Sequence, residues 1–539
     1  MRIIYVDVDT LRADHTTPYG YHRPTTPNLQ RLADKSVVFD RYYCSDSPCL
    51  PSRAALTSGQ FDITNGVIGH YGADAQFRLE AGHGPEPDRP LLGQWLGWGD
   101  HYTASISVFA ERHRAYFFHG NFRESIRASA NWGDEEAPDI NRAAVDWLQR
   151  HKDEENWYLH LTSWEPHTNY TQPAEWTEMM AASGPVQAWP DEETIAAHAE
   201  IYGPRSALDL HHSLKNPGGG SPVPHNMPDA VASRADFEHL INGFDGAISY
   251  WDHYFGLLMD TLEELGIADD TAVIVSADHG ESFGELGMYA EHGMAGEPVH
   301  RLPLVVYWPG LTDELPAEAR HNDALLYNID LAPTLAELVG LDKPAGWQGT
   351  SFAAALRGEQ IESREYLVLG HGAMTYQRAV RTRDHLYIRT YHPGTFRTEW
   401  EQLFHLAEDP YLTRNLIDEE PELATRMRSH LTEWWHEYAG RPGCLPDPMQ
   451  ANLQTGPIYY NQPGPYAQHL RDTGRAHLAD HLEQQLATLT VPVPWHAPPL
   501  APLPGDPPEM DRPLRAPSDR DVGAGPVLRL DRESDVGMV

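Results

Sequence analysis

Residues 47–59 of this chain read SPCLPSRAALTSG, and this segment sets the expectations for the rest of the sequence. Pro51 suits the first turn of a helix, so Cys49 is expected just before a helix start. Backbone N–H groups at a helix N-terminus favour an anion, and Arg53 adds a positive charge nearby. The segment therefore predicts an anion-binding turn, although a small buried cysteine in an ordinary strand-to-helix turn would give a similar pattern.

The sequence on both sides of this segment alternates between short apolar runs and amphipathic stretches. Strands are expected at Ile3–Val8, Val37–Tyr43, Trp157–Thr162, Ala272–Ser276 and Pro303–Tyr307. Helices are expected at Thr26–Ala33, Ile140–Arg150 and Asp236–Leu265. This alternation predicts an α/β fold with a large, mostly parallel sheet between helices.

The pattern changes from Tyr366 onward. Residues 376–391 alternate like an antiparallel meander, and a helix is expected at Pro421–Tyr438. After Gly440 the chain is rich in proline, with one helical piece near Gln468–Leu486 and an extended tail from residue 491. We therefore expect three parts: an α/β catalytic domain at 1–362, a smaller α+β domain with an antiparallel sheet at 363–440, and a Pro-rich extension at 441–539.

Acidic residues follow two of the expected strands. Asp9 comes directly after the first strand, and Asp278 with His279 follows the strand at Ala272–Ser276. Loops at the carboxyl ends of strands face the ligand cleft of an α/β sheet, and carboxylate and imidazole groups are common metal ligands. Asp278 and His279 therefore predict a metal pair, and Asp9 lies at the corresponding end of the first strand. Asp7 either supports these ligands or is structural.

These segments resemble the sulfatase family of the alkaline-phosphatase superfamily. Residues 49–59 are similar to its signature Cys-x-Pro-Ser-Arg followed by Leu-Thr-Gly, with Ser58 inserted before the glycine. The resemblance implies an alkaline-phosphatase-like fold and oxidation of Cys49 to formylglycine by a formylglycine-generating enzyme. It also implies one divalent metal held by Asp9, Cys49, Asp278 and His279. Many sulfatases carry two adjacent aspartates where this chain has Asp9-Thr10, so the ligand count is left open.

The same resemblance, which covers roughly residues 1–438, implies further site residues. His167, within WEPHTNY at 164–170, is similar to the histidine of a Pro-His-x-Pro-Tyr loop that contacts the substrate oxyanion or leaving group. His292 stands nine residues before Arg301, where the family often carries a lysine or histidine of the sulfate pocket. The lysine of the family's Gly-Lys-Trp-His segment is missing, and Arg112 or His113 is expected to replace it.

The implied activity is hydrolysis of a sulfate ester, of a sulfated carbohydrate or an aryl compound. One hydroxyl of the hydrated aldehyde attacks sulfur, Arg53 and His292 neutralise the oxygens, and His167 assists the leaving alcohol. Oxygen ligands favour calcium, while His279 leaves manganese or zinc open. Two alternatives remain: a phosphonate monoester or phosphodiester hydrolase of the same superfamily, and a non-catalytic protein that binds sulfated glycans.

Composition limits the partners. The chain has 539 residues and a formal charge of −38, which argues against nucleic acid or an anionic membrane as a partner. Its three cysteines cannot form a disulfide framework and fit a reducing compartment. No apolar run reaches bilayer length, and Asp7 interrupts the N-terminal run before it could form a signal peptide. We expect a cytoplasmic protein; its oligomeric state and natural substrate are not predicted.

Overall fold

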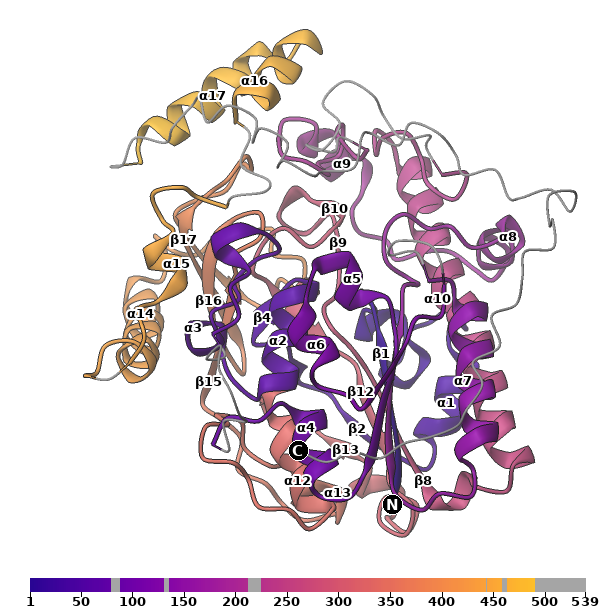
Figure 1. The fold of residues 1–539 in the computed structure, drawn as a ribbon. Helices are drawn as coiled ribbons and strands as arrows, with labels where there is room; N and C mark the ends of the chain where they lie inside the picture. Colours follow the sequence, from indigo (N-terminus) through magenta and orange to yellow (C-terminus); the bar gives the residue numbers. More distant parts are fainter. Residues whose placement is uncertain (79–87, 130–134, 212–223, 443, 458–462, 490–539) are drawn as a thin grey trace, which may run out of the picture. The chain divides into compact units, whose positions relative to one another are not determined.

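A mixed β-sheet runs through the middle of the fold (Figure 1). In this computed structural model the described residues are 1–78, 88–129, 135–211, 224–442, 444–457 and 463–489. The order of the strands across the sheet is β13 (His321–Asn322), β2 (Val37–Phe39), β12 (Leu304–Tyr307), β8 (Thr271–Ala277), β1 (Arg2–Val8), β7 (Trp157–Ser163), β5 (Tyr102–Ile106) and β6 (Glu124–Ile126).

Most neighbouring strands of this sheet are parallel, as the sequence predicts. β1 lies between β7 and β8 and pairs with both in parallel over its whole length. β12 is antiparallel to both of its neighbours, so the sheet is mixed. β7 and β8 are buried along their whole length, because helices cover both faces of the sheet.

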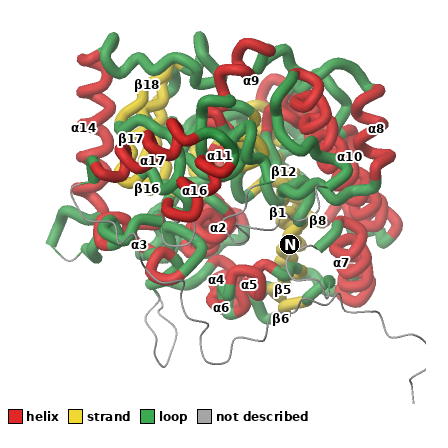
Figure 2. The backbone as a smooth tube through the Cα atoms, turned by 90° about the horizontal axis from the view of Figure 1, so that it is seen from above, coloured by secondary structure: helices red, strands yellow, loops and turns green. Residues whose placement is uncertain are grey.

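Helices form a layer on each face of the sheet. α1 (Pro27–Ala33), α7 (Ala137–His151) and α10 (Arg234–Glu264) cover one face, and α2 (Cys49–Ser58), α4 (Leu92–Trp98) and α12 (Leu331–Leu338) cover the other (Figures 1 and 2). α2 begins at Cys49, two residues earlier than Pro51 suggests, because the N–H of Ser52 already donates to the carbonyl of Pro48 at 3.0 Å. Cys49 is therefore part of the helix.

Two small sheets lie beside the central one. One has the order β11 (Arg301–Leu302), β3 (Tyr42–Tyr43) and β14 (Leu326–Tyr327), and the other pairs β10 (Tyr289–Glu291) with β9 (Ser282–Phe283). The single strand expected at Val37–Tyr43 is thus divided, with β2 in the central sheet and β3 in a small one. The remaining α-helices before residue 362 are α3 (Asp62–Asn65), α5 (Phe109–His113), α6 (Tyr116–His119), α8 (Ala174–Ala182), α9 (Glu192–His198), α11 (Glu297–His300) and α13 (Ala353–Leu356).

The C-terminal part contains the predicted antiparallel sheet. Its order is β18 (Glu401–His405), β17 (His385–His392), β16 (Tyr376–Thr382) and β15 (Tyr366–His371), and β4 (Asp46–Ser47) adds to β15 in parallel. α14 (Pro421–Tyr438) packs on this sheet, with Met427, Leu431 and Trp434 in a shared core with Val380 and Ile388. β4 comes from the segment just before Cys49, so this sheet touches the candidate site. The domain boundaries at residues 362 and 440 stay a prediction.

Three further helices follow: α15 (Pro448–Ala451), α16 (Pro463–Asp472) and α17 (Ala476–Ala487). The sequence predicts one helical piece near Gln468–Leu486, where the structure has both α16 and α17. The break follows from Gly474, which adopts φ +80° just after the end of α16. The described residues belong to one compact unit, and the expected tail lies outside them. Among the helices that the structure describes, none is both long and apolar enough to cross a lipid bilayer.

Candidate active site

The ends of β1 and β8 bring the predicted aspartates together. Because the two strands are parallel and in register, with Val8 opposite Ala277, Asp9 and Asp278 leave the sheet side by side. The backbone N–H of Thr10 donates to Asp278 Oδ1 at 3.1 Å, and the Thr10 hydroxyl donates to Asp9 Oδ1 at 3.0 Å. Thr10, which stands where many sulfatases have a second aspartate, thus ties the two carboxylates together.

Helix α2 delivers Cys49 and Arg53 to the same place. The two residues are four apart, so they lie on one face of the helix. Cys49 Sγ is 3.2 Å from His279 Nε2. Arg53 is fully buried and its Nη1 lies 2.7 Å from Asp278 Oδ2 and 3.2 Å from Asp9 Oδ2. Among the described residues, Arg53 Nη2 has no hydrogen-bond partner, so one donor group of this guanidinium is left for another oxygen.

Four predicted metal-ligand residues form one cluster. Asp9, Cys49, Asp278 and His279 each offer a ligand atom, and these atoms lie within 4.8 Å of one another in a buried environment. Two carboxylates, an imidazole and the side chain at position 49 are a donor set that fits a divalent cation. The cluster is also rich in carboxylates, because Asp7, Asp9 and Asp278 all contact the guanidinium of Arg53.

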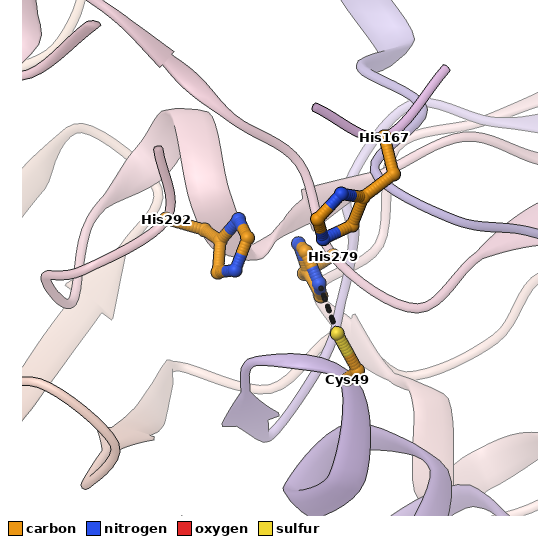
Figure 3. Close-up of side chains that lie close together, drawn as sticks. All are labelled: Cys49, His167, His279 and His292. Carbon is orange, nitrogen blue, oxygen red and sulfur yellow. Dashed lines mark hydrogen bonds between the residues drawn. The ribbon is translucent and has the colours of Figure 1, made fainter. Parts of the chain in front are cut away.

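The three predicted histidines converge on Cys49 (Figure 3). His167 comes from the loop after β7, His279 from the loop after β8, and His292 from the residue after β10. The ring of His292 lies 4.2 Å from that of His279 and 5.3 Å from that of His167. Cys49 with these histidines makes a second group whose ligand atoms lie within 4.8 Å of one another. All the residues predicted for the site thus lie together; their roles stay predictions.

The structure separates the two candidates for the missing lysine. Arg112 Nη2 lies 3.1 Å from Asp9 Oδ2, and its guanidinium stacks over the Trp164 ring at 4.3 Å. Trp164 stacks in turn on His167, with ring centroids 4.0 Å apart. His113 instead packs 4.7 Å from the ring of His70 and 5.0 Å from that of Phe109. Arg112 is therefore the residue that reaches the carboxylate cluster.

Sequence reasoning left open the role of Asp7 and missed several supporting residues. Asp7 accepts a hydrogen bond from Arg53 Nε at 2.7 Å and lies 3.2 Å from His160 Nε2, so it orients the guanidinium. Glu281 accepts from the Tyr170 hydroxyl at 2.7 Å and from the Thr168 hydroxyl. That carboxylate links the loop of His167 to the loop of His279. Its position two residues after His279 was the only available signal.

Burial sets the protonation states of the site. Burial, with the charges of Asp9 and Asp278, raises the pKa of the Cys49 thiol well above its usual value, so an unmodified cysteine is uncharged here. Burial lowers the pKa of His279 and of His292 to about 4. Burial opposes ionisation of Asp9, but Arg53 holds its pKa well below the usual value. His279 and His292 are therefore neutral near pH 7, which is the form in which an imidazole nitrogen can bind a metal.

Comparison with known proteins places this arrangement among characterised folds. A protein-family model described as Sulfatase matches residues 2–341, and one described as N-sulphoglucosamine sulphohydrolase, C-terminal, matches residues 284–437. An ulvan-active sulfatase of Formosa agariphila is 22% identical over 464 residues, which cover 81% of this chain and 82% of the relative.

Two solved structures show the same fold. One is the structure of a protein in complex with its substrate D-glucosamine-2-N,6-O-disulfate. It has a TM-score of 0.63 at 17% identity, and the match covers 81% of this chain and 98% of the other chain. The other, a phosphonate monoester hydrolase from Silicibacter pomeroyi, has a TM-score of 0.61 at 18% identity and covers 81% of this chain and 94% of its own. These scores are nearly equal, so the fold alone does not separate the two chemistries.

Proposed function

Because the chain belongs to the sulfatase family, we propose that it hydrolyses a sulfate ester of a carbohydrate, with a formylglycine made from Cys49 as the nucleophile. The observation that carries this proposal is the position of Cys49 at the start of α2, within ligand distance of Asp9, Asp278 and His279. A thiol held there is uncharged and would form a sulfur-linked adduct with no easy route onward. An aldehyde hydrate supplies one hydroxyl to attack sulfur and a second to expel sulfate.

A divalent metal would be held by Asp9, Asp278, His279 and the side chain at position 49. Calcium suits the carboxylate oxygens best, and the imidazole leaves manganese or zinc as other candidates. When bound, such a metal lowers the pKa of the attacking hydroxyl and offsets charge on the sulfate oxygens. Thr10 supports this set through its bonds to both carboxylates, in place of a second aspartate.

The other site residues are assigned to substrate charge and proton transfer. Arg53 donates from Nε and Nη1 to carboxylates, and its Nη2 is assigned to a sulfate oxygen. Arg112 takes the place of the family's lysine, and His292 is assigned to the sulfate pocket. His167, stacked on Trp164 and near His292, is assigned to the leaving alcohol. Maturation of Cys49 requires a formylglycine-generating enzyme as a partner.

A carbohydrate is proposed as the leaving group because similar proteins act on ulvan and on a glucosamine disulfate. The experiment that tests the function compares turnover of an aryl sulfate, an aryl phosphonate and an aryl phosphodiester by the purified chain. Intact mass measures conversion of Cys49 in the same sample. Preference for the sulfate with a converted Cys49 is the expected result. Preference for the phosphonate would establish the alternative hydrolase, and no turnover of any ester by converted protein would favour a glycan-binding role.

A further inference from the structure

The C-terminal helix pair, α16 with α17, binds the segment Tyr202–Asp209, which lies far from it in the sequence. The carboxylate of Asp209 is 2% exposed and accepts both terminal nitrogens of Arg475, at 2.7 and 2.9 Å. The Tyr466 hydroxyl donates to Asp209 at 2.7 Å, and His469 Nε2 lies 2.8 Å from it. A buried carboxylate with four such contacts is a strong anchor, because charge-assisted bonds of this kind are roughly twice as strong as neutral ones.

The helix pair also contacts the N-terminal end of the segment Tyr202–Asp209. The N–H of Gly203 donates to the Tyr466 hydroxyl at 2.8 Å, and the Tyr202 hydroxyl donates to Gln485 at 2.7 Å. Between these anchors, Arg205 adopts φ +67°, a conformation that residues other than glycine rarely take. Its N–H donates to the backbone carbonyl of Asp209 at 3.2 Å, so this turn ends on the residue whose carboxylate is anchored.

The opposite side of this segment contacts Met288–His292, which contains β10 and carries His292. The N–H of Tyr289 donates to the carbonyl of Arg205 at 2.9 Å, and Ser206 forms an antiparallel bridge with Met288. Arg205 Nε lies 3.8 Å from Glu291 Oε2. The other oxygen of Glu291 accepts the N–H of His292 at 2.9 Å and lies 3.3 Å from its Nε2. A continuous chain of contacts thus runs from the helix pair to the candidate sulfate pocket.

We propose that Asp209 is a positioning residue through which the C-terminal helix pair holds Arg205 against Glu291 and so fixes His292. This inference rests on the proposed role of His292 in binding the sulfate group. If the anchor is released, the segment Met288–His292, which contains β10, should open more often, and His292 should contact the substrate less well. The nucleophile on α2 keeps its own contacts, so binding should suffer more than the chemical step.

The test uses the full chain with Asp209→Asn, Arg205→Ala and the control Glu200→Gln. Glu200 pairs with His477 of the same helix pair at 2.8 Å, but both side chains are exposed and neither belongs to the series of contacts described above. Hydrogen exchange is followed in peptides covering residues 286–294 and 271–277, and kcat and KM are measured with 4-nitrophenyl sulfate. Asp209→Asn and Arg205→Ala should speed exchange in 286–294 and raise KM by about five-fold or more, with kcat within about three-fold.

The control should change neither quantity, and exchange in the central strand at 271–277 should stay unchanged in all variants. Faster exchange confined to residues 200–211, with KM unaltered, would overturn the proposal. If Asp209→Asn does not fold, Arg205→Ala decides, because its side chain is partly exposed and contacts Glu291 directly. If the chain without substitutions, carrying a converted Cys49, lacks sulfatase activity, the proposed function fails. The exchange of residues 286–294 still decides whether Asp209 positions this segment.

Discussion

Replacing Arg112 with alanine removes the guanidinium that links Asp9 to the ring of Trp164. Arg112 is 13% exposed, lies 3.1 Å from Asp9 and stacks on Trp164. A hydrogen bond to a charged group contributes about 1.5–3 kcal/mol, and about 1.36 kcal/mol corresponds to a ten-fold change in rate, so kcat/KM should fall by roughly 10- to 150-fold. Asp9 keeps its contact with Arg53, so the free energy of unfolding should fall by less than about 2 kcal/mol.

The assay is steady-state hydrolysis of an aryl sulfate, with intact mass used to confirm that position 49 is equally converted in each variant. Arg112→Lys should recover part of the loss, since the charge remains while the planar stack on Trp164 is lost. His113→Ala is the matched control, because this neighbouring side chain packs on His70 and Phe109 and should change kcat/KM by less than about three-fold. An Arg112→Ala variant with nearly full activity, or a larger loss in His113→Ala, would refute the assignment.

Three further predictions concern the nucleophile, the metal and stability. Cys49→Ser should stall as a sulfated adduct visible by mass, since serine lacks the second hydroxyl, whereas Cys49→Ala should fold without turnover; sustained turnover by either contradicts the mechanism. Asp278→Asn should weaken calcium binding, measured by calorimetry, by at least about ten-fold, and unchanged affinity would remove Asp278 from the ligand set. Burial raises the pKa of Glu165 from 4.5 to about 8, so the folded state retains a proton that the unfolded chain releases. The free energy of unfolding should therefore fall between about pH 4.5 and about pH 8, and Glu165→Gln should flatten that slope in denaturant titrations; an unchanged slope would exclude Glu165 as its source.

The sequence predicts the strand ends well because a parallel sheet constrains them strongly. An apolar run followed by an acidic residue indicates a strand end that faces the ligand cleft of an α/β fold, and the family motifs assigned Asp9 and Asp278 to one site there. Family resemblance supplied Cys49, His167 and His292. Contacts across the sheet edge were beyond reach, because the two-residue strand β4 joins β15 some 324 positions later, as from Ser47 to His371, and so short a segment has no periodicity to read.

The choice between Arg112 and His113 illustrates a second limit. Adjacent residues on a short helix point in directions that differ by about 100°. A shift of one residue in the register of the helix would therefore place His113 in the direction that Arg112 takes. Sequence reasoning could not fix that start, and only the stack on Trp164 shows which side chain reaches Asp9. The contact between Asp209 and Arg475 is harder still, since 266 residues separate them and each looks like an ordinary surface charge in the sequence.

The electrostatics of the site explain how a chain with a formal charge of −38 can take an anionic substrate. The overall field repels a sulfated glycan at long range, but at physiological salt charges more than about 8 Å away are largely screened. At short range Arg53 is already compensated by Asp7, Asp9 and Asp278, so it adds donors more than net attraction. In the proposed mechanism the bound metal, with Arg112, supplies the missing positive charge. In that mechanism, substrate selection therefore depends on contacts within hydrogen-bond reach of position 49, where the metal would be held, more than on the net charge of the protein surface.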